Sequence, residues 1–299
     1  MIYIIGNTLF GYPKMTDIQT DYFKNSFIPY IKKTVREGDI LVHVGNIFYN
    51  KQSAHFKVLK DVMNIFDEIS TLMQIFLLKG LNEEFSLDLF NNKKNIKIIN
   101  ETKRVKNIIF IPSGDFFMPD SDTEYLFGSS SALEIPGVKR SFNGFYDNEK
   151  GNDININVTS PYQLNKDFAT IGHGFYAFNL KQNDIRFIEN NYSPKFKEIY
   201  IDDLSQLKDI DTKSKNFIDL VIDSKIVELT ENKNKVDMFL AKNDFNNVYF
   251  TENTDKGKEI VMKNRNDIRN ILIDNAEDNM IEDLNDIFGI YDSVRKDDI

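Results

Sequence analysis

Apolar and polar residues follow two alternating patterns along the first hundred residues of this 299-residue chain. Short apolar runs at 1 to 5, 39 to 44 and 74 to 79 predict buried strands, since each is bounded by polar or glycine-containing turns. Between them, apolar residues recur at helical spacing from about Ile18 to Arg36 and from about Ser53 to Ser70. This alternation predicts a parallel, layered α/β sheet whose loops gather at the carboxyl ends of its strands.

The middle of the chain favours strands over helices. Short apolar runs at 96 to 99 and 107 to 111 follow the first three predicted strands. From about 124 to 201 the pattern becomes strand-rich, and it predicts a second sheet that packs on the first. The candidate strands of this region are 124 to 128, 154 to 158, 174 to 180, 184 to 189 and 196 to 201.

The last third predicts a small satellite domain and a helical tail. After a polar stretch at 202 to 215, a strand at 217 to 222, a short helix at about 234 to 241 and a strand at 247 to 251 form a β-α-β unit. These patterns divide the chain into a core over 1–201, a βαβ cap over 202–255 and an acidic helical tail over 256–299.

Charge is distributed unevenly between these parts. Residues 1–200 hold 23 Lys+Arg and 23 Asp+Glu, so the net charge of −9 arises entirely from the remainder, which holds 14 and 23. That acidity argues against DNA wrapping around the last third and suits a protein partner. In the tail, Ile281, Leu284, Phe288 and Tyr291 repeat at helical spacing. This stripe packs either on its own domain or on a partner, and we take it as the candidate partner-binding surface.

Composition excludes several classes of protein. The chain has no cysteine, so disulfides and thiolate zinc sites are excluded. The sequence enters a strand without a basic signal region, and no apolar run reaches the length of a membrane span. We therefore expect a soluble, cytoplasmic protein that does not bind membranes. There is no internal repeat, Walker loop or dinucleotide-binding glycine motif.

Three polar loops follow the first three predicted strands. They read Gly6-Asn7-Thr8-Leu9, Gly45-Asn46-Ile47-Phe48-Tyr49 and Gly80-Leu81-Asn82-Glu83. Further along come Phe127-Gly128-Ser129, Asn143-Gly144-Phe145-Tyr146-Asp147, Ser160-Pro161-Tyr162-Gln163 and Gly174-Phe175.

In this order, the motifs resemble those of SbcD-like DNA repair nucleases, which are calcineurin-like metallophosphoesterases, and most closely the nuclease subunit of the tailed-phage recombination endonuclease. The similarity extends over roughly residues 1 to 200, and the later parts resemble the family's DNA-facing cap and its ATPase-docking helix. The resemblance implies an α/β/β/α sandwich that holds two divalent cations. Position by position, the family's ligands fall on Asn7, Leu9, Asn46, Leu81, Asn82, Ser129, Phe145 and Asp147.

These positions depart from the family's chemistry. Two-metal phosphodiesterases need carboxylate and imidazole ligands, one of them a bridging anion, whereas here only Asp147 is a strong ligand for a hard cation. The family's leaving-group histidine falls on Asn82, or on Glu83 if the loop is shifted by one residue. We therefore expect no catalytic residue and no cofactor, with weak Mn or Mg binding as the alternative.

Other titratable residues have simpler interpretations. The chain has three histidines, and we expect His43 to be a core residue, His55 a surface residue and His173 part of a tight turn. Two charged clusters keep open alternatives. The acidic cluster forms either a replacement cation site or solvated turns. The basic cluster either contacts phosphate groups or is a solvated face. The two clusters are Asp115, Asp120 and Asp122, and Lys93, Lys94, Lys97, Lys103, Arg104 and Lys106.

Three functional hypotheses follow from the resemblance. The first is an inactive nuclease-like subunit, viral in origin, that acts as a binding or scaffold component of a DNA recombination or repair complex. Its partner would be an SbcC-like ATPase or an active nuclease copy, with weak DNA contact and with homodimerisation left open. The second is a structural protein of a phage virion or assembly. The inactive subunit of the first hypothesis would instead remain in the host cytoplasm. The third is a rewired phosphoesterase or nuclease that holds one cation through Asp147, Asn7, Asn46 and Glu83.

Overall fold

The computed structural model describes residues 1–261 with short gaps, and residues 262–299 lie outside the described part. The gaps are residues 14, 51–53, 82–86, 116–121, 130–136, 145–151, 166–171, 212–215, 244, 246 and 255–256. The chain divides into two compact units, Met1–Lys195 and Phe196–Ile299, which are described separately.

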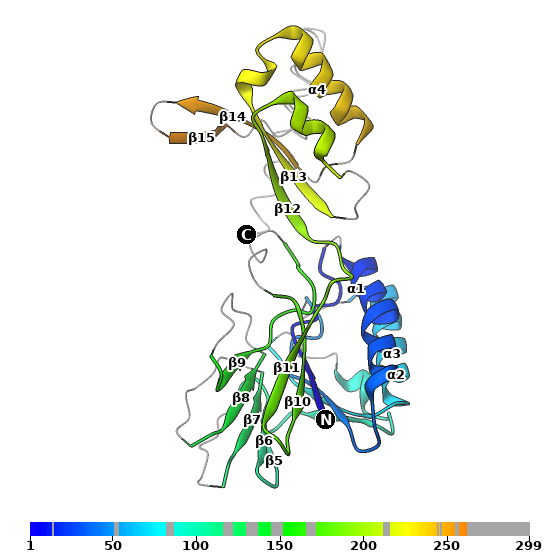
Figure 1. Ribbon diagram of the computed structural model, residues 1–299. Coiled ribbons are helices and arrows are strands. Elements are labelled where there is room, and N and C mark those ends of the chain that lie inside the picture. The colour runs from blue at the N-terminus through cyan, green and yellow to red at the C-terminus, as the bar shows by residue number, and fades with distance from the viewer. Residues whose placement is uncertain are drawn as a thin grey trace, which may run out of the picture. The chain divides into compact units, whose positions relative to one another are not determined.

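A six-stranded sheet forms the centre of the first unit, in the order β11-β10-β1-β2-β3-β4 (Figure 1). The four strands from β1 to β4 are parallel, and β10 and β11 are added antiparallel beside β1. Their bounds are β1 Ile2–Ile5, β2 Ile40–His43, β3 Gln74–Leu78, β4 Ile96–Ile99, β10 Gly174–Asn179 and β11 Asp184–Glu189. The predicted parallel α/β core is confirmed.

Helices cover one face of this sheet. The predicted first helix is continuous from α1 through a π-helical segment, η1, to α2, and the second is α3. Along α3, Val58, Val62, Ile65, Phe66 and Ile69 are buried at spacings of three and four, so a single face packs on the sheet. The helical bounds are α1 Thr16–Tyr22, η1 Phe23–Phe27, α2 Ile28–Thr34, α3 Phe56–Ser70 and the short 3₁₀ segment η2 Leu87–Phe90.

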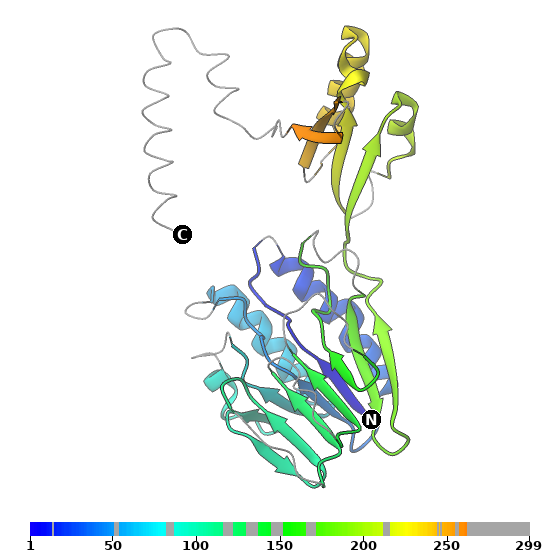
Figure 2. The same ribbon diagram turned by 90° about the vertical axis from the view of Figure 1, so that its left-hand side faces the viewer.

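A five-stranded sheet, in the order β5-β6-β7-β8-β9, packs on the other face. Alternation along β1 directs Ile2 and Ile4 towards it, while Tyr3 and Ile5 pack with the helices. Figure 2 views the first unit from the side of this second sheet, with the helices behind. Its strands are β5 Lys103–Val105, β6 Ile108–Ile111, β7 Tyr125–Gly128, β8 Arg140–Asn143 and β9 Asn155–Asn157.

The composition of the second sheet differs from the prediction. Strands β10 and β11 were expected there but extend the first sheet, where Tyr3 pairs with Ala177 and Ala177 with Arg186. Hydrophobic alternation identifies a strand without identifying its neighbour, so this partnership could not be predicted. Strands β5 and β8 were not predicted, because each is only three or four residues long and carries charged residues.

The second unit is a four-stranded sheet, β12-β13-β14-β15, with helices between its strands. Strands β12, β13 and β14 are parallel and β15 is antiparallel to β14. Leu220 and Ile222 of β13 pack with Val236 and Leu240 of α4 in its core. The elements are β12 Phe196–Ile201, η4 Leu204–Asp209, β13 Phe217–Asp223, η5 Ser224–Val227, α4 Thr230–Lys242, β14 Asn247–Thr254 and β15 Gly257–Val261.

Two predicted domain limits therefore move. Strand β12 begins the second unit instead of ending the core at 201, because it pairs along its whole length with β13 and the rings of Phe196 and Phe217 stack 4.6 Å apart. The helical tail was expected from 256, but β15 continues the sheet from Gly257 to Val261. The described residues thus form a mixed α/β protein, layered as helices, sheet and sheet in the first unit.

Candidate functional site

The loops after β1 and β2 converge at the carboxyl edge of the first sheet. Beyond the strands their backbones stay paired, with the Asn7 amide 3.0 Å from the Gly45 carbonyl oxygen and the Leu9 amide 3.1 Å from that of Asn46. Asn7 and Asn46 adopt φ angles of 50° and 59°, the left-handed region that asparagine tolerates better than most residues. The sequence of these turns therefore fixes the two asparagines face to face.

The two amide side chains bond directly to each other in the interior. Asn46 Nδ2 donates to Asn7 Oδ1 at 2.8 Å, and both side chains are almost completely buried. Asn7 Nδ2 donates to the Val158 carbonyl at 2.7 Å, while Asn46 Nδ2 also reaches the Gly144 carbonyl at 3.2 Å. The Leu81 amide donates to Asn46 Oδ1 at 3.1 Å. Both asparagines thus bond to neighbouring loops, and we call this group the amide network.

Close backbone approach is needed to form the amide network. A Cβ atom added to Gly144 would lie 1.8 Å from the Val44 carbonyl oxygen, so only glycine brings this segment against β2. One added to Gly45 would lie 2.7 Å from the Ser129 Cβ and 3.0 Å from the Gly80 Cα. These glycines draw the loops from both sheets to one point, which is why residues distant in sequence reach Asn46.

Two other matched positions have structural contacts of their own. Leu9 is buried in the core between the helices and the first sheet, on the same side as Phe10 and Ile47. Ser129 is buried at the end of β7, and its hydroxyl donates to the Lys79 carbonyl oxygen at 2.7 Å. Leu81 is half exposed, and only its backbone joins the amide network. An aliphatic side chain such as Leu9 provides no ligand atom to a cation.

Several predicted site residues lie outside the described part of the chain. These are Asn82, Glu83, Asp120, Phe145 and Asp147 of the first unit, and Ile281, Leu284, Phe288 and Tyr291 of the tail. Among the residues that are described, no group of three or more His, Cys, Asp or Glu side chains is placed to hold a metal ion.

A second polar cluster, next to the amide network, was not predicted. Gln19 of α1 donates through Nε2 to the carbonyls of Thr8 and Leu9 at 3.1 and 2.9 Å, and its Oε1 accepts from the Gly11 amide at 3.1 Å. The Tyr162 hydroxyl also donates to the Thr8 carbonyl, so the Pro-Tyr-Gln segment holds the first loop from the other side. A glutamine on the buried face of an amphipathic helix was the sequence signal for this cluster.

His43 belongs to the same buried cluster. The Thr8 hydroxyl lies 3.0 Å from His43 Nε2 and 3.2 Å from the Ile47 carbonyl oxygen, so it donates to the carbonyl and accepts from the imidazole N–H. Burial disfavours the charged imidazolium and lowers the pKa of His43 to about 3. His43 is therefore neutral and structural, as predicted.

The other two histidines also have local roles. His55 is exposed and caps α3, because its Nδ1 accepts from the Lys57 amide at 3.4 Å. His173 precedes β10, and its Nδ1 lies 3.0 Å from the Ser160 carbonyl oxygen. The position of His55 agrees with the surface role predicted for it, whereas His173 lies in the connection before β10 and not in an assigned turn.

The described members of the two charged clusters contribute to local structure. Asp115 accepts from the Thr102 amide at 2.6 Å, which fits a capped turn. In the basic cluster, Lys93 pairs with Asp67 at 2.6 Å, and the Lys97 ammonium lies 5.6 Å from the centre of the Phe76 ring.

Comparisons with known proteins add little to this geometry. No protein-family model and no curated protein matches the chain. The crystal structure of a protein of unknown function from Aquifex aeolicus is similar over 53% of this chain and 89% of that one, with 15% identity and a TM-score of 0.33. Within the described residues, no helix is long and apolar enough to cross a membrane.

Proposed function

We propose that the chain is a catalytically inactive, nuclease-like subunit that binds a protein partner in a DNA recombination or repair complex. The proposal rests on the SbcD-like order of loops in the sequence, the layering of helices, sheet and sheet in the first unit, and one observation of the site. That observation is the hydrogen bond between Asn7 and Asn46, which occupy the positions of two metal ligands in the resemblance.

The donor set of this pair supports an inactive site. A bridging ligand between two cations must offer anionic oxygen, whereas Asn46 directs its amide donor to Asn7 Oδ1 and its own oxygen already accepts from the Leu81 amide. Each asparagine would have to break these buried bonds before it could turn an oxygen towards a cation. The amide network therefore favours a role in loop structure over metal-assisted hydrolysis.

The first test measures metal content and cleavage together. We expect the purified chain to hold no stoichiometric Mn, Zn or Fe and to leave single- and double-stranded DNA intact when manganese is added. Elemental analysis that finds two tightly held metals per chain would refute the inactive assignment. Manganese-dependent cleavage would instead favour the rewired phosphoesterase.

A second test concerns the partner. Because the last 26 residues hold nine acids and two bases, the tail suits a hydrophobic groove with a basic rim on another protein. We expect removal of residues 276–299 to leave the 1–200 core folded and to abolish association with an SbcC-like ATPase in a pull-down. Replacing Leu284 and Phe288 with alanine should cause most of the same loss.

The outcomes of this pull-down separate the alternatives. A Ser293→Ala variant, which lies in the tail but off the apolar stripe, serves as the matched control and should bind normally. If the truncated chain binds as tightly as the full chain, or does not fold, the stripe belongs to its own domain. Capture of capsid or tail proteins in place of the ATPase would favour the virion role.

A further inference from the structure

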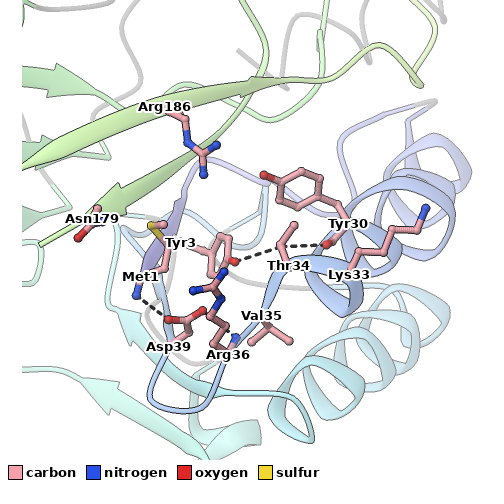
Figure 3. A pocket seen from close by; sticks show the side chains of 10 residues that line it. All are labelled: Met1, Tyr3, Tyr30, Lys33, Thr34, Val35, Arg36, Asp39, Asn179 and Arg186. Carbon is pink, nitrogen blue, oxygen red and sulfur yellow. Dashed lines mark hydrogen bonds and ion pairs between the residues drawn. The ribbon is translucent and has the colours of Figure 1, made fainter. Parts of the chain in front are cut away.

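A cavity of about 460 Å³ lies at the amino end of β1, at the opposite edge of the first sheet from the amide network. Its walls come from the amino end of β1, the carboxyl end of α2 and strand β11 (Figure 3). The volume falls within the range of small-molecule sites. It was not predicted, because no motif marks it and its residues are far apart in the sequence.

The floor of this cavity is set by strand register. Tyr3 lies opposite Ala177, and Ala177 lies opposite Arg186, so the three residues form one row across β1, β10 and β11. Residues directly opposite one another share a face of the sheet, here the face covered by the helices. Tyr3 and Arg186, which both line the cavity, flank the small side chain of Ala177 on this face.

Two guanidinium groups face this space. Arg186 points into the cavity from β11, and Arg36 points into it from the turn after α2 (Figure 3). Neither side chain forms an ion pair or a hydrogen bond with the other residues that the structure describes. The nearby carboxylate of Asp39 is already engaged by the Met1 nitrogen at 2.5 Å and by the Arg36 backbone amide at 2.9 Å.

Helix capping does not explain this arrangement. Lys32 and Lys33 in the last turn of α2 already complement the negative end of the helix dipole. Arg186 belongs to a different element and approaches from across the sheet. The lining holds four cationic groups, the Met1 nitrogen, Lys33, Arg36 and Arg186, and one carboxylate, Asp39, which the Met1 nitrogen already engages. This excess of positive charge favours an anion, and the planar fork of arginine fits phosphate oxygens.

Two aromatic side chains, Tyr3 and Tyr30, also line the cavity. Tyr30 lines the cavity, with its ring held edge-on against Phe175 at 5.2 Å. Tyr3 is almost completely buried and donates to the Thr34 hydroxyl at 3.0 Å, while burial raises the pKa of Tyr3 and keeps its hydroxyl protonated. Aromatic rings beside paired arginines suit a ligand with an organic ring attached to its phosphate.

We propose that this cavity binds a small phosphate monoester, of about the size of a nucleoside monophosphate, with the phosphate held between Arg36 and Arg186. The organic part lies along Tyr30. This site is separate from the amide network, and the proposal does not depend on the nuclease-like assignment.

The test is calorimetric titration of the full chain with adenosine 5′-monophosphate, inorganic phosphate and adenosine. We expect the monophosphate to bind with a dissociation constant below about 1 mM, more tightly than phosphate, and adenosine to show no binding. Arg186→Ala and Arg36→Ala should each weaken binding at least about tenfold, because each removes a guanidinium group that donates charge-assisted hydrogen bonds to the phosphate. Arg186→Lys should retain part of the affinity.

The matched control is Lys60→Ala, which removes a positive charge from the exposed face of α3 and should bind normally. Affinity should also rise between about pH 5 and pH 7 as the ester loses its second proton, whose pKa is near 6, while the arginines stay charged. Equal affinity for adenosine, or unchanged affinity in Arg186→Ala, would overturn the proposal. Inorganic phosphate that binds as tightly as the monophosphate would overturn the role of Tyr30.

Discussion

Introducing carboxylates into the amide network is the sharpest perturbation that this structure suggests. In the double variant Asn7→Asp and Asn46→Asp, the atoms now joined by a 2.8 Å hydrogen bond become oxygens of two buried carboxylates. The variant also removes the donors to the Val158 and Gly144 carbonyls. Because aspartate and asparagine have nearly the same shape and volume, we expect the double substitution to destabilise the folded chain without altering its packing.

The magnitude follows from the lost contacts. Three donated bonds disappear, and a buried acceptor left without a partner costs about 1–3 kcal/mol, so the carbonyls alone account for roughly 2–6 kcal/mol. Repulsion between the carboxylates is limited, since one of them takes up a proton when its pKa rises. A loss of this size is a large part of the 5–15 kcal/mol that stabilises a typical domain.

Denaturant unfolding followed by circular dichroism measures this loss. Because at least one carboxyl group has a pKa raised above its unfolded value, the folded variant binds more protons than the unfolded chain. Its stability should therefore rise as the pH falls from 7 towards 5. Adding manganese at neutral pH should restore part of the stability, since a cation can then bind between the two carboxylates.

Asn152→Asp is the matched control. Asn152 is exposed and uses only its Oδ1, which accepts from the amides of Ile154 and Asn155, so an aspartate preserves both bonds. We expect this variant to unfold like the parent chain. If the double variant also unfolds like the parent without metal, the amide network does not contribute to stability as inferred.

Three further predictions concern the surrounding loops. The pKa of His43 is lowered from 6.5 to about 3 by burial, so the unfolded chain binds one more proton in that window and stability falls on acidification. His43→Leu should reduce this slope by up to about 1.4 kcal/mol per pH unit in denaturant titrations, and an unchanged slope would refute the assignment. Gly144→Ala should destabilise the chain by more than about 2 kcal/mol, because the added Cβ would lie 1.8 Å from the Val44 carbonyl oxygen. As a control, Gly128→Ala should cost much less, because its Cβ would have no contact under 3.4 Å. Tyr162→Phe should cost about 1–2 kcal/mol by removing a buried donor, and a variant as stable as the parent would show that the hydroxyl is dispensable.

The sequence by itself determined the elements with strong periodicity. The parallel strands β1, β2 and β3 and the helices α1, α2 and α3 lie where apolar spacing predicted them, because burial of one face requires that spacing. It also predicted that the loops after these strands gather at one edge of the sheet, and Asn7 and Asn46 meet there. The core position of His43 was predicted from its place on an apolar strand.

The tertiary structure alone decided which strands are partners and which buried polar groups meet. The hydrophobic alternation along β10 cannot show which sheet the strand joins, because a strand with this pattern fits either sheet. The contact of Tyr162 with the Thr8 carbonyl joins residues more than a hundred positions apart, and Gln19 reaches the same carbonyl only because α1 folds back over the loop. The cavity between Arg36 and Arg186 also depends on the tertiary structure, because β11 and the carboxyl end of α2 come together only after folding.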